Sequence, residues 1–575
     1  MLLGLNRHAW IAIAPWLMAG LFLGPVVVGL LGTWLPAAGY LPALGQSEFS
    51  LTPLISFTNY PGVGKAFWLS LSTGLFSSLL ALMSVFILLL GLYPSTIFKK
   101  LERFLAPILS IPHAAFAIGF GFLITPSGWF FRAIHEVTGW FNRPPIITTL
   151  QDSEGLSLTL ILLLKETPFL LFMALATLPT LKVSKTLWLG ASLGYSKVFT
   201  WTWLLFPQLY QRLRLPFYSV IAYSLSVVDI SIIAGPTAPP TAAVMITRLF
   251  TDADLSHRFL GAVGASALLI LVLVCLLGVR IIEQLLTKLR SRQLAKGNRR
   301  KAPQKILFGL SMTTLLMLTV SYFFSLTVTF LWSIAQRWRY PDIFPSALTN
   351  TSWLRSFDRL SETLTTTFSI ALCSAVLAVI LCLLALENEV RLRYKYSHNI
   401  NSSWLLLWLY LPLLVPQVAF LFGFQVSLIY LNLDGHWLAV LWSHLVFVIP
   451  YVFLTLSEPY RNYDDRYSYI AKSLSGQPIR AYFKIKFTML LRPILYAFAI
   501  GFSVSIAQYL PTLFVGAGHY ATITTEAVAM TSGSNRRMIA VLAMWQQLLP
   551  LAIFTLAIVI PAIRFRQHRS MSHTE

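Results

Sequence analysis

Charged residues are scarce in this chain. Only 11% of its 575 residues are Asp, Glu, Lys or Arg, whereas 56% are hydrophobic and the mean hydropathy is +0.70. A soluble domain is typically about one quarter charged. This deficit excludes a soluble globular enzyme. Together with repeated apolar runs of about 20 residues, it predicts an all-α polytopic membrane protein.

Cysteine and the common chemical motifs are also missing or few. The three cysteines, Cys275, Cys373 and Cys382, each lie inside an apolar run and have neither disulfide nor metal-site spacing. The segment PGVGKAF (61–67) has a lysine after glycines but lacks the Ser or Thr that completes a phosphate-binding loop. We therefore expect no catalytic residue, no metal site and no cofactor in this chain.

Positive charge is unevenly distributed along the chain, whose net charge is +22. With the N-terminus inside, 31 of the 43 Lys and Arg residues fall on inside segments and 11 on outside loops. This bias predicts a multi-pass membrane protein with both termini in the cytoplasm, and it excludes nucleic acid as the reason for the charge. We expect about 12 membrane spans, at roughly 10–34, 66–92, 105–125, 156–179, 215–235, 259–282, 306–332, 363–386, 403–431, 436–457, 490–510 and 538–563.

The chain is predicted to contain two parallel halves. A basic, apolar-poor segment divides it into a first half (1–283), a linker (284–305) and a second half (306–575). TPFLLFMAL (167–175) aligns with IPYVFLTLS (449–457), and PHAAFAIGFGF (112–122) aligns with PQVAFLFGFQV (416–426). Six spans return the chain to its starting side, so the repeats share one orientation and a solute pathway is expected between them.

A polar, glycine-centred loop also occurs twice, each time between the fourth and fifth span of a half. The two copies are residues 188–207 and 470–489. Glycine permits a sharp turn and close backbone approach, and aromatic side chains anchor interfaces. We therefore predict two equivalent docking elements for a cytoplasmic partner, formed by Gly190, Ala191, Gly194, Trp201 and Pro207 in the first copy and by Ala471, Gly476 and Phe483 in the second.

These loops resemble the EAA loop of bacterial ABC-importer permeases, whose pattern is Glu-Ala-Ala, three residues, Gly, then an aromatic, an aliphatic and Leu-Pro. Phe206-Pro207 occupies the Leu-Pro position in the first copy. Four residues depart from the pattern: Trp188 and Ile470 replace the glutamate, and in the second copy Lys486 stands at the aliphatic position and Met489 at the proline position.

The whole chain is similar to fused permeases of the iron(III) and thiamine type, in which both six-span halves form one polypeptide. The resemblance implies a type I importer permease in the bacterial inner membrane. It also implies two copies of a cytoplasmic ABC ATPase, which bind the ATP, and a periplasmic solute-binding protein. Nothing in the sequence decides between iron, thiamine, an anion, a polyamine or another solute.

Five polar residues lie inside the expected spans: Lys165, Glu166, Asp229, His444 and Gln508. Such residues are costly in a membrane and are candidates for the solute pathway. A contact between helices is the favoured interpretation for each. Lys165, Glu166 and Asp229 also keep open an ion-coupled secondary transporter with 6 + 6 spans. A membrane-embedded transferase is disfavoured because the chain lacks an acidic metal-binding motif.

Overall fold

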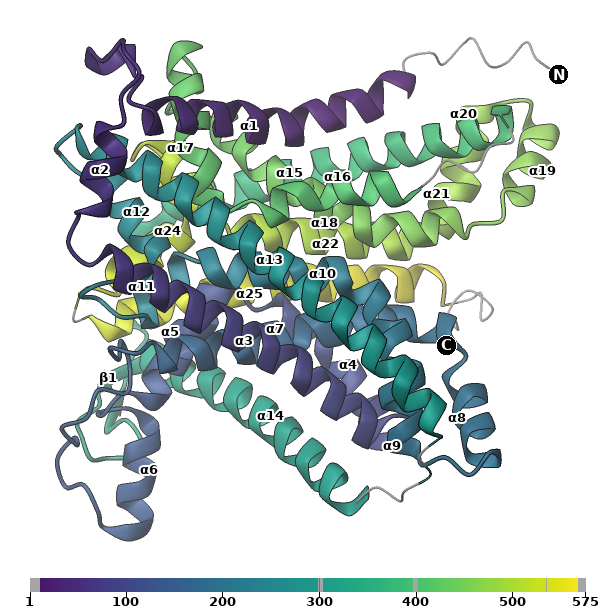
Figure 1. Ribbon diagram of the computed structural model, residues 1–575, viewed down its shortest axis with the longest axis horizontal. Helices are drawn as coiled ribbons and strands as arrows, with labels where there is room; N and C mark the ends of the chain where they lie inside the picture. Colours follow the sequence, from purple (N-terminus) through teal and green to yellow (C-terminus); the bar gives the residue numbers. More distant parts are fainter. Residues whose placement is uncertain (1–10, 298, 300–303, 397–401, 534, 567–575) are drawn as a thin grey trace.

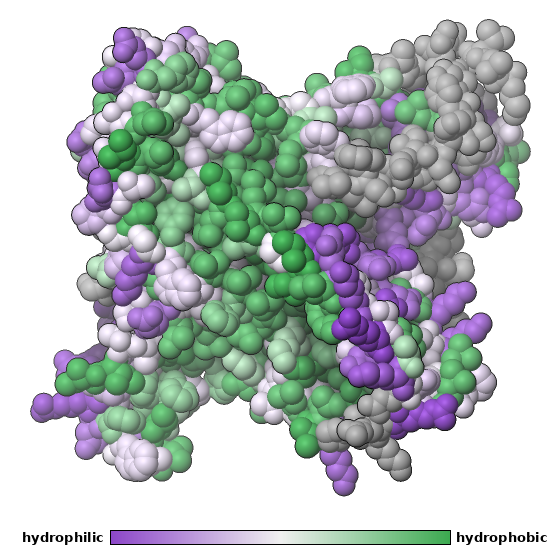
Figure 2. Space-filling model, viewed as in Figure 1, coloured by the Kyte–Doolittle hydropathy of each residue, from purple (hydrophilic) through white to green (hydrophobic). Residues whose placement is uncertain are grey.

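The computed structural model describes residues 11–297, 299, 304–396, 402–533 and 535–566. Its long helices run side by side between two ends of the molecule (Figure 1). Figure 2 shows hydrophobic side chains as a broad band across the middle of one face, with hydrophilic side chains gathered toward both ends. This arrangement of apolar helices confirms the predicted all-α membrane fold.

In the first half, the long apolar segments of the sequence form long helices. α1, α3 and α7 each have 22 residues or more. The elements are α1 (Ala14–Ala37), η2 (Pro42–Leu44), α2 (Thr52–Thr58), α3 (Val63–Leu92), α4 (Thr96–Ser110), α5 (His113–Ile124), α6 (Trp129–Thr138), α7 (Leu156–Thr177), η3 (Leu178–Leu181), α8 (Val183–Ser192), α9 (Lys197–Thr200), η4 (Trp201–Leu205), α10 (Phe206–Ser226), α11 (Asp229–Ala234), α12 (Ala242–Thr251) and α13 (His257–Lys296).

The second half follows a similar order, but its described residues lack counterparts of η2, α2 and α6 and include an added pair of antiparallel strands, β1 and β2. The elements are α14 (Gln304–Ile334), β1 (Ala335–Arg337), β2 (Ala347–Leu348), α15 (Thr351–Tyr396), α16 (Ser402–Leu414), α17 (Gln417–Tyr430), α18 (Trp437–Arg461), α19 (Arg466–Ser475), α20 (Pro478–Ala481), η5 (Tyr482–Lys486), α21 (Phe487–Met489), α22 (Leu491–Ile506), α23 (Leu510–Gly516), α24 (Ile523–Met530) and α25 (Arg536–Arg564).

The number of spans differs from the expected 12. Among the described residues, nine helices are long and apolar enough to cross a membrane, or up to eleven if each of two bent pairs is one span. The spans expected at 105–125, 215–235, 403–431 and 490–510 are each interrupted. Prolines explain two of the breaks, because the residue before a proline is pushed out of the helical region: Ile111 is extended before Pro112, and α16 and α17 meet at 99° at Pro416.

The first helix of each half packs against the other half. α1 lies along α17 and also contacts α15 and α18, whereas α14 lies along α3 and α5. In Figure 1, α1 runs beside α15 and α16 at one side of the molecule, and α14 runs beside α3 at the opposite side. The halves are therefore interlocked in space. The boundary expected at 283 falls inside α13, which continues to Lys296, and the one expected at 306 falls inside α14, so the division into halves at these residues stays a prediction.

Small residues allow both crossings. A β-carbon added at Gly32 of α1 would come within 2.7 Å of the carbonyl oxygen of Gly423 in α17, and one added at Gly29 would collide with the Phe420 carbonyl. In the reciprocal contact, a β-carbon at Gly119 of α5 would come within 2.8 Å of the Ser325 carbonyl of α14. Gly119 and Gly423 are equivalent in the two aligned segments. The same glycine position therefore allows the close approach of α14 in one half and of α1 in the other.

We expect Gly29→Leu to destabilise the protein by about 1–3 kcal/mol, because the new side chain must push α1 away from α17. Gly24→Leu on the same helix is the matched control, since a β-carbon there meets nothing within 4 Å. The thermal unfolding midpoints of both variants in detergent provide the measurement. Equal midpoints would mean that the crossing is not tightly packed.

Candidate functional site

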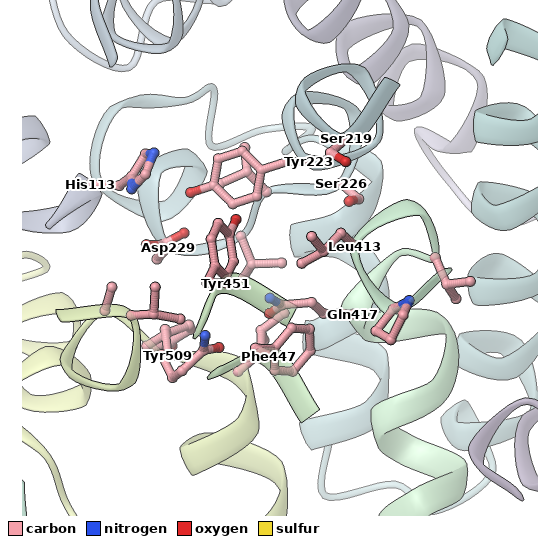
Figure 3. Close-up of a pocket in the computed structure, with 18 residues that line it drawn as sticks. His113, Ser219, Tyr223, Ser226, Asp229, Leu413, Gln417, Phe447, Tyr451 and Tyr509 are labelled. Atoms are coloured by element: carbon pink, nitrogen blue, oxygen red, sulfur yellow. The ribbon is translucent and has the colours of Figure 1, made fainter. Parts of the chain in front are cut away.

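A cavity of about 150 Å³ lies between the two halves, deep in the bundle. Its wall is partly apolar, with Leu413, Val415 and Phe447 among the residues that line it. Its polar side chains come from both halves, and Figure 3 shows most of them around the cavity. They are His113, Ser219, Tyr223, Ser226 and Asp229 from the first half and Gln417, Tyr451, Gln508 and Tyr509 from the second.

Helix breaks bring these polar residues to the cavity. His113 and Gln417 are the first residues of α5 and α17, directly after the duplicated prolines. Asp229 is the first residue of α11, after the extended residue Val227 interrupts the span, and Gln508 lies in the matching break between α22 and α23. Irregular backbone at membrane depth is tolerated where it is buried in protein or lines a cavity. The four helix breaks are therefore consistent with a cavity at this depth, because the irregular backbone of each break lies at the cavity wall.

Two of the five predicted pathway residues line the cavity. Asp229 and Gln508 form part of its wall. Asp229 is buried, with only 9% of its surface exposed. Within the described chain, its carboxylate forms no ion pair with a lysine or arginine. A buried carboxylate without a counter-ion is costly. Its position at the cavity wall gives that cost a functional explanation.

Lys165 and Glu166 make separate contacts just outside the cavity. The Lys165 ammonium donates to the Ile111 carbonyl over 2.7 Å and lies near the rings of Phe116 and Tyr322. Glu166 Oε1 lies 3.3 Å from His113 Nε2. Lys165 therefore joins α7 to α5 and α14, whereas Glu166 reaches a residue of the cavity wall.

His444 is placed differently from the other predicted pathway residues. It is buried in α18, with Nδ1 2.8 Å from the Ser505 hydroxyl and Nε2 2.9 Å from the Thr512 hydroxyl. Both ring nitrogens thus join α18 to α22 and α23. His444 does not line the cavity, and its contacts are those of a polar link between helices.

Sequence reasoning missed the aromatic residues of the cavity. Tyr223, Tyr451 and Tyr509 all line it, and Figure 3 shows Tyr223 and Tyr451 beside Asp229. Tyrosine is common in membrane spans, so its presence alone gave no signal. The duplicated prolines are a signal that could have identified some cavity residues. Tyr451 directly follows Pro450, and His113 and Gln417 directly follow Pro112 and Pro416.

The two glycine-centred loops fold alike. α8 and α19 each end at a glycine in the left-handed region, Gly194 with φ 81° and Gly476 with φ 64°. Only glycine adopts this conformation without strain, and it closes helices readily. A short helix and a π-helical turn then follow in both copies, η4 at Trp201–Leu205 and η5 at Tyr482–Lys486. The equivalence inferred from the sequence is thus present in the backbone.

The predicted docking residues differ in their exposure. Ala191, Gly194, Gly476 and Phe483 are exposed, and Pro207 and Ala471 are half-buried. Trp201, expected to anchor a partner, is instead fully buried and packs edge-on against Tyr93. Gly190 is also buried and meets the Thr200 side chain. Trp201 and Gly190 therefore support the first element from inside, which corrects their expected place at its surface.

Exposed apolar side chains take the place of the missing glutamates. Trp188 is 69% exposed on α8, and Ile470 is 59% exposed at the equivalent position of α19. Leu193 and Leu474, near the ends of the same helices, are also exposed. Each element therefore offers a partner an apolar surface with no acidic residue at the position where the EAA pattern has one.

A buried ion cluster ties the second element to the spans. The Lys486 ammonium lies 3.0 Å from Glu387 on α15 and 3.2 Å from Asp465 at the start of α19, and the lysine side chain is only 4% exposed. Tyr460 of α18 donates to the same Glu387 carboxylate over 2.6 Å. Lys486 thus departs from the aliphatic pattern for a structural reason, because it joins α15, α18, α19 and η5.

A similar cluster lies beneath the first element. Glu283 of α13 is buried, accepts hydrogen bonds from Tyr210 and Tyr218 of α10 and lies 3.1 Å from Arg214 and 2.7 Å from Arg280. The π-helical turn η4 leads directly into α10. The Glu283 carboxylate therefore joins α13 to α10, the helix that continues from the first docking element.

Comparison with known proteins agrees with this architecture. No protein-family model matches the chain. Over 528 residues the chain is 32% identical to the inner membrane ABC transporter permease protein YnjC of Escherichia coli (strain K12), and the match covers 91% of this chain and 94% of the relative. The chain belongs to the ABC transporter permeases. It is accordingly a multi-pass subunit of the inner membrane rather than an enzyme, and ATP is hydrolysed by a partner ATPase.

We expect Lys486→Met in this permease to cost about 3 kcal/mol of stability, because Glu387 and Asp465 lose a buried counter-charge. Lys484→Met in the same turn is the matched control, since Lys484 is exposed. The free energy of unfolding in detergent, compared between the two variants, is the measurement. A loss of similar size in both would contradict a structural role of the cluster.

Proposed function

We propose that this permease is the membrane subunit of an importer. Solute is delivered by a binding protein at one end of the molecule and passes through the cavity between the halves. Two copies of an ABC ATPase bind α8 and α19 at the other end and drive the cycle. The proposal is supported above all by one observation, the presence of two matched docking elements at the same end of an interlocked bundle (Figure 1).

The side of the membrane follows from charge. α8 and α19 lie at the end where α13 finishes and α14 begins (Figure 1), next to the basic segment 283–305. Cytoplasmic segments of membrane proteins carry an excess of Lys and Arg. This end is therefore assigned to the cytoplasm, and the end that holds α2, α6, α12 and β1 to the outside. The termini themselves, 1–10 and 567–575, fall outside the described residues.

The proposed ATPase contact is apolar. At the positions where the EAA pattern has glutamate, Trp188 and Ile470 offer large exposed hydrophobic side chains. Exposed apolar residues at matched positions of a membrane protein's aqueous end favour a protein partner over solvent. Two equivalent elements favour two identical partner copies, one for each half.

Transmission to the cavity follows from the way each element is fixed. The Lys486 cluster joins α19 to α15 and α18, and α18 carries Tyr451 of the cavity wall. In the first half, η4 leads into α10, which carries Ser219 and Tyr223. A movement of either docking element is thus passed along rigid helices to the cavity. Rigid-body motion of the halves about a central site is a common transport mechanism.

The double variant Trp188→Asp with Ile470→Asp is expected to weaken capture of the cognate ABC ATPase about tenfold or more, because a charge replaces each apolar contact. Binding of the purified ATPase to the permease in lipid nanodiscs measures this. Trp140→Asp with Ile146→Asp is the matched control, since both side chains are exposed at the opposite end.

Unchanged ATPase binding in the first double variant would contradict docking on α8 and α19. The alternative of an ion-coupled secondary transporter makes a different prediction, namely solute uptake driven by a proton gradient with no ATPase present. Membership of the ABC permease family disfavours that alternative. Gly194→Asp with Gly476→Asp is a further disruption of the same two elements, since both glycines have positive φ.

A further inference from the structure

The chemistry of the cavity wall points to a class of solute. Asp229 is the acidic residue of the wall, and four aromatic rings share that wall: Tyr223, Phe447, Tyr451 and Tyr509. The nearby charges of Lys165 and Glu166 compensate each other. Among the described residues, the buried Asp229 carboxylate forms no ion pair with a lysine or arginine. A bound cation would remove the cost of that buried charge.

The aromatic rings favour an organic cation over a metal ion. Among the described residues, no group of three or more His, Cys, Asp or Glu side chains is arranged to hold a metal ion. A bare metal ion requires several such ligands. Aromatic faces around a carboxylate are instead the arrangement that recognises ammonium groups, by attraction of the positive charge to the ring faces.

The size of the cavity limits the group that enters it. Its volume is about 150 Å³. An apolar protein cavity of roughly this volume holds a benzene molecule. A trimethylammonium group or a single small ring therefore fits between the two halves.

We propose that the cavity binds a small organic cation, a quaternary ammonium or a protonated amine, with Asp229 as its counter-ion and Tyr223, Tyr451 and Tyr509 around it. This inference rests on the proposed function, because it names the solute class of the same pathway. Gln417 and Gln508 supply neutral hydrogen-bonding groups on the opposite half and leave the charge of the site to Asp229.

Three probes of nearly the same shape test the inference on the full-length permease in lipid nanodiscs. Choline is the cation, 3,3-dimethylbutan-1-ol is its neutral counterpart and 3,3-dimethylbutanoate is the anion. Isothermal titration is expected to show choline binding about tenfold or more tighter than the alcohol, with no binding of the anion. Asp229→Asn should abolish the preference for choline over the alcohol, because it removes the charge and keeps the shape.

Matched variants separate this effect from a folding defect. Asp252→Asn removes a carboxylate in the loop between α12 and α13, outside the cavity, and should leave the preference intact. Tyr451→Leu should weaken choline binding more than Tyr451→Phe does, since only the second variant keeps an aromatic face. Thermal unfolding midpoints verify that each variant is folded.

Equal binding of the alcohol, preference for the anion, no binding of choline, or an unchanged preference in Asp229→Asn would each overturn the inference. These failures are distinct from failure of the proposed function. If the permease captures its ATPase through α8 and α19 but does not prefer choline, only the solute class is wrong. If the ATPase does not bind, the proposed function itself is wrong.

Discussion

The close approach of α1 to α17, and of α14 to α5, is the contact on which the rest of the structure depends. Because Gly32 meets Gly423 and Gly119 meets Ser325, each half holds a helix that the other half provides. The two halves cannot separate without exposing these surfaces. A hydrocarbon environment tolerates broken helices only inside protein. The interlocked halves supply that interior, and so the four helix breaks around the cavity depend on the crossings.

The docking elements and the cavity are linked by a second constraint, the cost of burying charge. Glu387 and Glu283 lie below the two elements and are both fully partnered, one by Lys486 and Tyr460 and the other by Arg214, Arg280 and two tyrosines. Satisfied polar clusters of this kind make a junction rigid, because any shift leaves a charge unpaired. A rigid junction passes motion on, whereas a flexible loop would absorb it.

Internal repetition and hydrophobicity were enough to predict most of the membrane spans and the equivalence of the two loops from the sequence. Apolar runs predicted most spans, and the duplicated glycine predicted that the segments of α8 and α19 are equivalent. The breaks before Asp229 and Gln508 were missed, since Val227–Val228 and Ala507 are as apolar as the span around them. Burial of Trp201 was missed because Tyr93, its partner, lies 108 residues earlier in the chain. Local patterns record hydrophobicity, not which distant segment covers a side chain.

The two halves share the arrangement of their helices, but the charged residues near the cavity in the first half have neutral equivalents in the second. Lys165 and Phe447 are equivalent by the duplicated proline, and each lies near an equivalent ring, that of Phe116 or Phe420. In the same alignment, Glu166 corresponds to a valine and His113 to Gln417. The second half contributes no acidic residue to the cavity wall, where a second carboxylate would repel that of Asp229. A shared cavity needs one counter-ion, so one half provides the charge and the other provides neutral surface.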